Sequence, residues 1–256
     1  MPRSADYMRA TLPALVLGLL SIALATGRAY GQSAATEASP SAMQTQLEAD
    51  QKTLHDWAYL SRYRDKNAKL GAPAPGEERV VFLGDSITDF WGLKYGKFFP
   101  GKPYVNRGIS GQTTPQMLVR FRPDVIALKP SVVVILAGTN DIAGNTGPES
   151  LEEIEGNLIS MVQLAKANNI RVVLSSLLPA CNHRRDATQI TQLNEWIKNY
   201  CNDGTCVFLN YYPSMVDASG ALSRELTNDC LHPNEAGYNV MQPLAEEAIQ
   251  RALAAR

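Results

Sequence analysis

Five short runs of apolar residues recur along the chain, and they predict the strands of its core. The run at 132–136, VVVIL, is apolar at every position, which is typical of a strand buried on both faces of a parallel sheet. The other runs are rich in the same β-type residues. The predicted strands span residues 79–83, 104–106, 132–136, 171–175 and 207–209.

Helix-like stretches fill the intervals between these strands. Ser150 with Glu153, and Asp186 with Gln189, have the spacing of a capping box, which predicts where two of the helices begin. Alternating strands and helices imply right-handed crossovers and a three-layer α/β/α sandwich around a parallel sheet. We therefore predict a five-stranded α/β fold. The predicted helices span residues 115–121, 150–167, 187–200 and 235–254.

The N-terminal part of the domain has a helical pattern of its own. Between residues 44 and 70, apolar side chains recur near one face, and the GAPAPG sequence at 71–76 ends the pattern. Residues 32–43 are small and polar without a period, which is typical of a disordered linker. We expect one domain over residues 44–256, with an N-terminal helix at 44–70.

Residues 1–31 have the pattern of a secretory signal peptide. Arg3 and Arg9 precede an apolar run at 12–25, and the small residues at 29–31 are typical of a signal peptidase site. The run, about 14 residues long, is too short for a comfortable membrane span. An uncleaved anchor is the alternative. Cleavage after residue 31 predicts a secreted or periplasmic protein that is not held in the membrane.

Composition and charge exclude some classes of partner. Over 256 residues, an apolar content of 45% and a charged content of 19% are ordinary for one sizeable globular core. The formal net charge of −1 gives no reason to expect nucleic acid or an anionic membrane as a partner. Nothing in the sequence indicates an oligomeric state.

The four cysteines lie in the exported part of the chain, where an oxidising compartment favours disulfides. Three pairings are possible. The short spacing between Cys201 and Cys206 favours a small closed loop, which would leave Cys181 to pair with Cys230. A zinc site is the alternative, but the chain has no C-x-x-C sequence and only three histidines.

Polar and glycine-rich segments follow the predicted strands at one edge of the sheet. In a parallel sheet, ligands bind at the carboxyl ends of the strands, near the point where the strand order reverses. The first of these segments is Gly84-Asp85-Ser86, where Ser86 could either cap the next helix or present its hydroxyl for chemistry. The later segments are 106–114, 137–141, 178–185 and 228–234.

These segments resemble the four sequence blocks of the GDSL, or SGNH, hydrolases, in the order in which that family carries them. The resemblance covers about residues 79–250. It implies a flavodoxin-like α/β/α fold and ester hydrolysis through a serine nucleophile, with no metal or cofactor. The matching residues are Gly84-Asp85-Ser86-Ile87, Gly111, Gly138-Thr139-Asn140-Asp141, and Asp229 with His232.

The resemblance also implies a role for each matching residue. Cys230 departs from the family pattern, because members often carry glycine close to this position. A disulfide to Cys181 is our interpretation, and it would help to hold His232 in place. The implied roles are Ser86 as nucleophile, Asp229 and His232 as the other members of a catalytic triad, and Ser86, Gly111 and Asn140 as donors in an oxyanion hole.

The chemistry of the side chains supports these roles independently. A serine hydroxyl is a weak nucleophile until a base accepts its proton. His55 lies in the N-terminal helix, away from the strand ends, whereas His183 and His232 are at the correct edge. Only His232 has a carboxylate, that of Asp229, three residues before it. This carboxylate could bind the second ring nitrogen and stabilise the imidazolium.

The oxyanion of a tetrahedral intermediate also needs hydrogen-bond donors. The Ser86 N–H opens a helix, and the Asn140 side chain supplies an amide N–H. Gly111 has no side chain to block the approach of its backbone N–H.

Other residues near this edge are weaker candidates. Asp85, Asp89 and Asp141 each adjoin a turn, and we expect them to fix the local backbone rather than to hold a metal or act on a glycosidic bond. The aromatic candidates, which could wall a substrate pocket or pack in the core, are Phe90, Trp91 and Tyr95. The possible contacts for an anionic or sugar substrate are His183 and Arg184, beside Arg185.

The sequence therefore predicts a secreted serine esterase that forms an acyl-enzyme at Ser86. No long apolar lid is visible, which favours short acyl groups, such as acetyl, on a small molecule or polysaccharide. A lysophospholipase or acyltransferase acting on lipid esters is one alternative. A non-catalytic carbohydrate-binding module on the same fold is another. The chain has no G-x-S-x-G sequence, which argues against the α/β-hydrolase fold.

Overall fold

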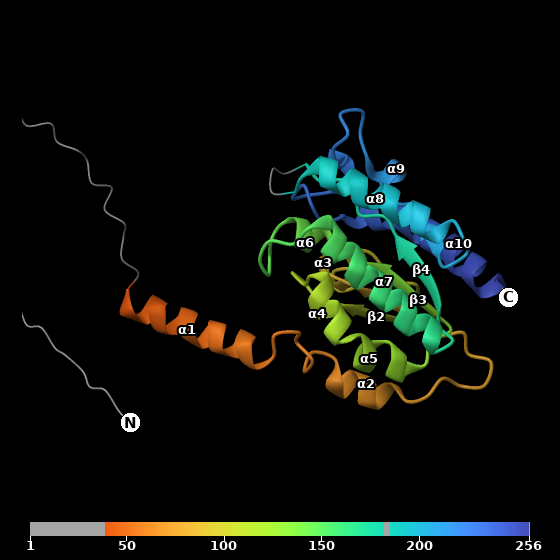
Figure 1. The fold of residues 1–256 in the computed structure, drawn as a ribbon, viewed down its shortest axis with the longest axis horizontal. Coiled ribbons are helices and arrows are strands. Elements are labelled where there is room, and N and C mark those ends of the chain that lie inside the picture. Colours follow the sequence, from red (N-terminus) through yellow and green to blue (C-terminus); the bar gives the residue numbers. More distant parts are fainter. Residues whose placement is uncertain (1–38, 182–184, 256) are drawn as a thin grey trace, which may run out of the picture. The chain divides into compact units, whose positions relative to one another are not determined.

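A computed structural model describes residues 39–181 and 185–255, and its centre is a parallel sheet of five strands (Figure 1). The strand order is β2-β1-β3-β4-β5, so the predicted α/β fold with a five-stranded parallel sheet is confirmed. The predicted signal peptide at 1–31 lies outside the described residues. The strands are β1 (Val80–Gly84), β2 (Tyr104–Gly108), β3 (Val132–Leu136), β4 (Arg171–Ser175) and β5 (Val207–Leu209).

Helices surround the sheet. The helix predicted over 115–121 is two short helices that meet at Arg120. The longer helices are α1 (Pro40–His55), α2 (Arg64–Leu70), α7 (Leu151–Ala167), α8 (Ala187–Cys201) and α10 (Glu235–Ala254). The shorter ones are α3 (Ser86–Asp89), α4 (Thr114–Val119), α5 (Phe121–Asp124), η1 (Ile126–Leu128), α6 (Thr139–Ile142), α9 (Tyr212–Met215) and η2 (Arg224–Leu226).

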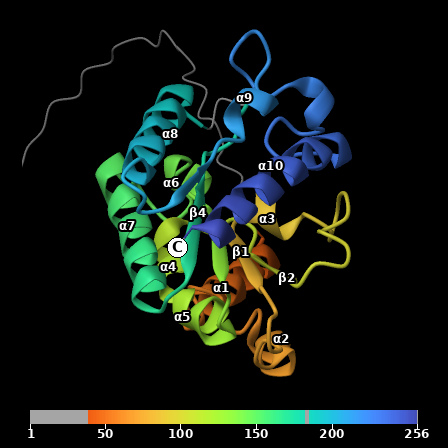
Figure 2. The same ribbon diagram turned by 90° about the vertical axis from the view of Figure 1, so that its right-hand side faces the viewer.

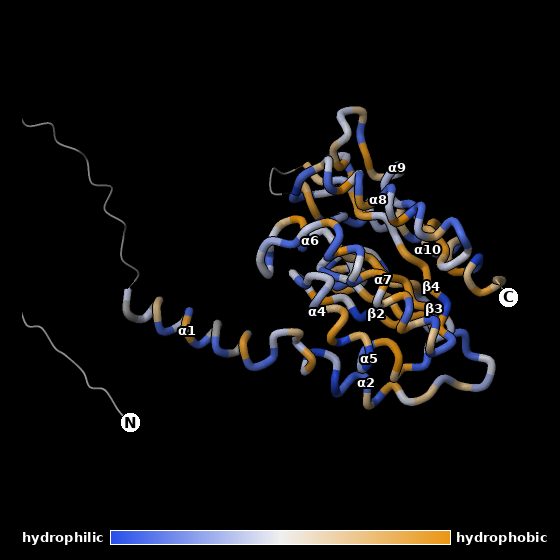
Figure 3. The backbone as a smooth tube through the Cα atoms, viewed as in Figure 1, coloured by the Kyte–Doolittle hydropathy of each residue, from blue (hydrophilic) through white to orange (hydrophobic). Residues whose placement is uncertain are grey.

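Alternate residues of each central strand face different helix layers, because side chains in a strand point to opposite faces in turn. In β1, Val81 and Leu83 pack in the cluster that contains α4, α7 and α8, whereas Val80 and Phe82 pack in the cluster that contains α10. Figure 2 shows α10 on the opposite side of the sheet from α7 and α8. All five residues of β1 and of β3 are buried, and Figure 3 shows apolar colouring along β3 and β4.

Side-chain caps begin the long helices where the sequence predicts. At the start of α7, Ser150 Oγ accepts a hydrogen bond from Glu153 N at 3.2 Å, and Glu153 Oε2 accepts one from Ser150 N at 2.7 Å. These reciprocal bonds complete the predicted capping box. At the start of α8, Asp186 accepts from Thr188 N at 2.7 Å. The helices over 150–167 and 187–200 are thus found within one residue of their predicted ends.

The single helix predicted over 44–70 differs from the structure, which has two helices separated by residues 56–63. The Asp56 carboxylate accepts hydrogen bonds from Leu60 N at 2.6 Å and Ser61 N at 2.9 Å, and Tyr59 has a left-handed φ of 52°. These local bonds compete with the helical ones, so the helix ends. The predicted linker at 32–43 also ends early, because α1 already begins at Pro40.

Residues 44–256 form one compact unit, and residues 39–43 are the described part of another. No helix within 39–181 and 185–255 is both long enough and apolar enough to cross a membrane.

The end of β2 lies unusually close to the helix that follows β1. A Cβ atom added at Gly108 would lie 2.1 Å from the backbone nitrogen of Asp89, in α3. Gly156, on the exposed side of α7, has no atom within 4 Å of such a Cβ. The first glycine is therefore required for packing, and the second is not.

We predict opposite effects of alanine at these two glycines. Gly108→Ala should lower the free energy of unfolding by about 3 kcal/mol, because the methyl group must push α3 away from the sheet. Gly156→Ala should raise it by about 0.5–1 kcal/mol, because alanine is the better helix former. Urea unfolding of both variants measures the difference. Equal stabilities would contradict the close approach of β2 and α3.

Candidate active site

Ser86 lies where the buried strand β1 turns into the short helix α3. Asp85 caps this helix by accepting a hydrogen bond from Ile87 N at 2.9 Å. The cap places Ser86 at the first helical position, where its backbone N–H has no partner within the helix. Only 8% of the Ser86 surface is exposed. Asp85, rather than Ser86, is thus the capping residue, and the serine hydroxyl is directed elsewhere.

The Ser86 hydroxyl lies against the imidazole of His232, 146 positions further along the chain. Ser86 Oγ is 2.8 Å from His232 Nε2, and His232 Nδ1 is 2.7 Å from Asp229 Oδ2. The fold therefore joins the three residues of the predicted triad in one hydrogen-bonded chain. With a proton on Nδ1, the second ring nitrogen can accept the serine proton.

Local hydrogen bonds fix the position of Asp229. Its Oδ1 accepts from His232 N at 2.8 Å and from Leu231 N at 3.1 Å. Burial alone would raise the pKa of the Asp229 carboxyl, but these hydrogen bonds and the imidazole together hold its pKa below the ordinary value. Asp229 is therefore a carboxylate at neutral pH and can keep the imidazole oriented.

Two further residues support His232, and the sequence reasoning did not identify the first of them. Thr227 is buried, and its hydroxyl donates to His232 O at 2.8 Å and accepts from Asp229 N at 3.3 Å. The Phe90 ring packs on the imidazole, with 4.8 Å between ring centroids. Trp91, in contrast, is a buried core residue among Phe82, Phe99 and Tyr238.

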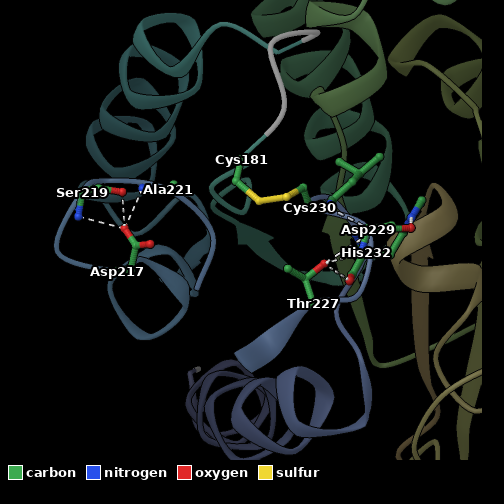
Figure 4. The surroundings of a disulfide bond; sticks show 9 residues. Cys181, Asp217, Ser219, Ala221, Thr227, Asp229, Cys230 and His232 are labelled. Carbon is green, nitrogen blue, oxygen red and sulfur yellow. Dashed lines mark hydrogen bonds and ion pairs between the residues drawn. A yellow bond between two sulfur atoms is a disulfide. The ribbon is translucent and has the colours of Figure 1, made fainter. Parts of the chain in front are cut away.

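The structure contains the Cys181–Cys230 and Cys201–Cys206 disulfides. Figure 4 shows the first of these beside Asp229 and His232. The backbones of its two cysteines are also joined, by a hydrogen bond of 3.1 Å from Cys181 N to Cys230 O. Cys230 has a left-handed φ of 65°, a conformation that glycine adopts at no steric cost. This conformation explains why glycine would suit the position. In this chain, the disulfide to Cys181 constrains the same stretch of backbone.

The two other predicted oxyanion donors lie at the ends of β2 and β3. Gly111 has a left-handed φ of 81°. Asn140 is buried in α6, and its amide nitrogen lies 3.0 Å from Gln112 O and 3.4 Å from Asp85 Oδ2. Gln112 and Asp85 are the chain neighbours of Gly111 and Ser86. The contacts of Asn140 therefore bring the three predicted donors to one edge of the sheet.

Asp89 and Asp141, two of the weaker candidates from the sequence, hydrogen-bond to residues of neighbouring loops and helices. Asp89 accepts from Ser110 Oγ at 2.7 Å and pairs with Arg62 at 3.4 Å. Asp141 Oδ1 accepts from Thr114 N at 2.8 Å. Within 39–181 and 185–255, no group of three or more histidine, cysteine, aspartate or glutamate residues could hold a metal ion.

The predicted substrate contacts His183 and Arg184 lie outside the described residues. Their neighbour Arg185 is described, and its Nη2 donates to Asn140 Oδ1 at 3.3 Å. A contact of this kind orients the Asn140 amide, because the oxygen end faces the guanidinium and the nitrogen end faces Gln112 O. The sequence indicates Arg185, together with its two neighbours, as a possible contact for an anionic or sugar substrate, and gives no sign of its bond to Asn140.

Buried carboxyl groups surround this edge of the sheet. Burial raises the pKa of Asp85 to about 7, against the hydrogen bond from Ile87 N. Burial also raises the pKa of Asp141 and, to about 7, that of Glu149, whose charge is further disfavoured by the charge of Asp141. Asp141 Oδ2 and Glu149 Oε2 are both buried and accept no hydrogen bond from any described residue, and we infer that the pair shares one proton.

Comparisons with known proteins identify the family that the chain matches. The model of the GDSL-like Lipase/Acylhydrolase family matches residues 82–240. Among solved structures, a GDSL-like lipase from Bacteroides thetaiotaomicron is 44% identical with a TM-score of 0.73, over 76% of this chain and 98% of its own.

Two relatives whose names state an activity are less similar in sequence than this lipase. Platelet-activating factor acetylhydrolase IB subunit alpha1 from Homo sapiens is 28% identical over 189 residues, which are 70% of this chain and 78% of the relative. An acetylxylan esterase from Geobacillus stearothermophilus is 26% identical over 197 residues, 64% of this chain and 90% of the relative.

The Asp141–Glu149 pair predicts a measurable pH dependence of stability. Between pH 4.5 and about 7, the folded state keeps a proton on Glu149 that the unfolded state has released. Stability from this pair is therefore complete below pH 4.5 and is lost as the pH rises through about 7. In Glu149→Gln, an amide N–H replaces the shared proton at every pH, so this loss should disappear.

Urea unfolding of the wild type and Glu149→Gln at several pH values tests this prediction. Asp85 also lowers the free energy of unfolding as the pH rises, and it does so in both proteins. The difference between the two curves of unfolding free energy against pH therefore isolates the effect of Glu149. If the two curves of unfolding free energy run parallel between pH 4.5 and about 7, Asp141 and Glu149 do not share a proton.

Proposed function

The chain belongs to the GDSL-like lipase/acylhydrolase family of ester hydrolases, and we propose that it is an exported serine esterase with Ser86 as its nucleophile. One observation carries the proposal: the hydrogen-bonded chain from Ser86 Oγ through His232 to Asp229, with distances of 2.8 and 2.7 Å. A serine in this environment can lose its proton as it attacks a carbonyl carbon.

In the acylation step, Ser86 Oγ bonds to the carbonyl carbon and its proton passes to His232 Nε2. Asp229 stabilises the imidazolium that forms. The tetrahedral intermediate collapses when the bond to the alcohol oxygen breaks, and His232 gives its proton to that oxygen. In deacylation, water takes the place of the alcohol: it loses a proton to His232, attacks the acyl carbon and releases the acid with a regenerated serine.

Ser86 N, Gly111 N and the Asn140 side chain are the proposed donors to the oxyanion. The Asn140 amide has two N–H groups. One bonds to Gln112 O at 3.0 Å, whereas the contact with Asp85 at 3.4 Å is long enough to be exchanged for a developing negative charge. The left-handed backbone of Gly111 supports the same role, because it requires glycine and leaves no side chain over the site.

We favour acetyl or another short acyl group on carbohydrate as the substrate. The names of two relatives support a short acyl group, because one is an acetylhydrolase and the other an acetylxylan esterase. They differ in the substrate that is named, which is platelet-activating factor for the first and acetylxylan for the second. Export would expose the enzyme to extracellular polysaccharide. Two disulfides support export, because such bonds persist in oxidising compartments.

Ser86→Ala should abolish ester hydrolysis. We expect kcat/KM for p-nitrophenyl acetate to fall by a factor on the order of 10⁴ or more, because the nucleophile is lost. Asn140→Ala should lower it by roughly 10²–10³, because one oxyanion donor is lost. Thermal unfolding of each variant serves as the folding control. Wild-type activity in a folded Ser86→Ala protein would refute the mechanism, whereas no hydrolysis by the wild-type protein would favour a non-catalytic binding module.

The two disulfides should differ in their effect on activity. Cys181→Ala with Cys230→Ala should lower kcat, because Cys230 lies between Asp229 and His232 and loses its link to residue 181. This bond also closes the longer loop, with a separation of 49 residues against 5, so its removal should destabilise more.

The matched control is Cys201→Ala with Cys206→Ala, which removes a disulfide at the far end of α8 from the site. We expect this variant to keep its hydrolytic rate. Measurements of kcat and of the urea midpoint separate the two effects. Equal kcat values for the two double variants would show that the first disulfide does not hold His232.

A further inference from the structure

Residues 56–63 lie outside the span that matches the family model, yet they are attached to the loop that carries Gly111. Gln112 Nε2 donates to Ala58 O at 2.7 Å, and Gln116 Nε2 donates to Trp57 O at 2.7 Å. We call residues 56–63 the N-terminal strap. Its backbone is held by Gln112, on the loop that carries Gly111, and by Gln116, in helix α4 directly after that loop.

A groove of about 700 Å³ separates the strap from this loop. The strap contributes Trp57, Tyr59 and Leu60 to its lining, and the loop contributes Ile109, Ser110 and Gly111. Because Gly111 belongs to both the groove and the proposed oxyanion site, a molecule in the groove would lie beside the ester that reacts. The groove is large enough for one or two sugar rings, since ligand pockets of about 300–1,000 Å³ hold small molecules.

The strap exposes two aromatic rings in this groove. Trp57 is 40% exposed and Tyr59 is 41% exposed, although aromatic side chains of this size gain most from burial. Tyr59 also has a left-handed φ of 52°, which is strained for any residue with a side chain. Glycine would relieve that strain, because it has no side chain. The backbone conformation at this position therefore favours glycine, yet the chain carries an exposed tyrosine ring there.

We propose that this groove is a carbohydrate subsite, in which Trp57 and Tyr59 stack on a sugar ring next to the acylated one. This proposal rests on the proposed esterase function. A pyranose presents C–H groups on its faces, which pack on the electron-rich face of an aromatic ring. Its hydroxyls point outward from the rim, toward polar side chains.

The remaining lining fits a sugar better than an acyl chain. Ser61, Arg64 and Ser110 place polar atoms in the groove between the apolar residues. A fatty chain would cover these groups without giving them hydrogen bonds, which is unfavourable. Sugar hydroxyls can both donate to and accept from them. The alternation of rings and polar groups therefore favours carbohydrate.

The test compares two acetyl esters that differ in the alcohol. We would measure kcat/KM for acetylated xylotetraose and for p-nitrophenyl acetate, whose leaving group is too small to extend along the groove. In Trp57→Ala and in Tyr59→Gly, the ratio of the first to the second should fall roughly 5–10-fold, mainly through KM for the oligosaccharide.

Lys129→Gly is a matched control for Tyr59→Gly. Lys129 has a φ of 50° and lies before β3, at the opposite end of the strands from the site, so glycine relieves the same strain there. Both glycine variants should keep or raise the melting temperature. Only Tyr59→Gly should change the substrate ratio.

Different outcomes separate failure of the subsite from failure of the esterase. An unchanged ratio in both aromatic variants, with hydrolysis still dependent on Ser86, would overturn the subsite. So would a selective loss of p-nitrophenyl octanoate hydrolysis, since the groove would then hold an acyl chain. If no ester is hydrolysed, titration calorimetry with unacetylated xylotetraose still decides: binding that Trp57→Ala removes supports the subsite, and no binding overturns it.

Discussion

The contact between Ser86 Oγ and His232 Nε2 depends on the position of β1 within the sheet. In the order β2-β1-β3-β4-β5, the connection after β1 runs toward β2, whereas the connection after β3 runs the opposite way, toward β4. A crevice forms at such a reversal, and the residue after β1 stands in it. Ser86 therefore meets a loop that lies 146 positions further along the chain.

Buried polar side chains hold the loops around this crevice. Arg120 is fully buried, and its guanidinium donates to Gly84 O at 3.0 Å and to Arg107 O at 2.8 Å. It thus joins the ends of β1 and β2 while Asp124, at 3.1 Å, balances its charge. Burial lowers the pKa of Arg120, but so basic a group stays charged at neutral pH. A buried ion pair of this kind gives little net stability and instead fixes geometry.

Much of this arrangement could be predicted from the sequence, for identifiable reasons. The strands are uniformly apolar and the long helices have side-chain caps, so local patterns determine both. His232 could be selected because it alone has a carboxylate three residues before it. Arg120 could not be identified, because its role depends on the carbonyl group of Gly84, in a distant segment. Thr227 could not be identified, because its bond to His232 O depends on how the loop between them folds back. The end of α1 was missed because the Asp56 cap competes with an otherwise regular helical pattern.

Gln112 connects the reaction site to the segment outside the family core. Its carbonyl oxygen accepts from Asn140, its side-chain nitrogen donates to Ala58 O, and its side-chain oxygen accepts from Arg120. One buried residue therefore sets the distance between the proposed oxyanion donors and the N-terminal strap. Since the core carries the proposed catalytic groups and the strap carries the exposed rings, the side chains at Trp57 and Tyr59 can vary without loss of the hydrogen bonds that Gln112 and Gln116 donate to the strap backbone. The strap is also attached by two of its own side chains, because Tyr63 donates a hydrogen bond to Gly108 O and Arg62 pairs with Asp89.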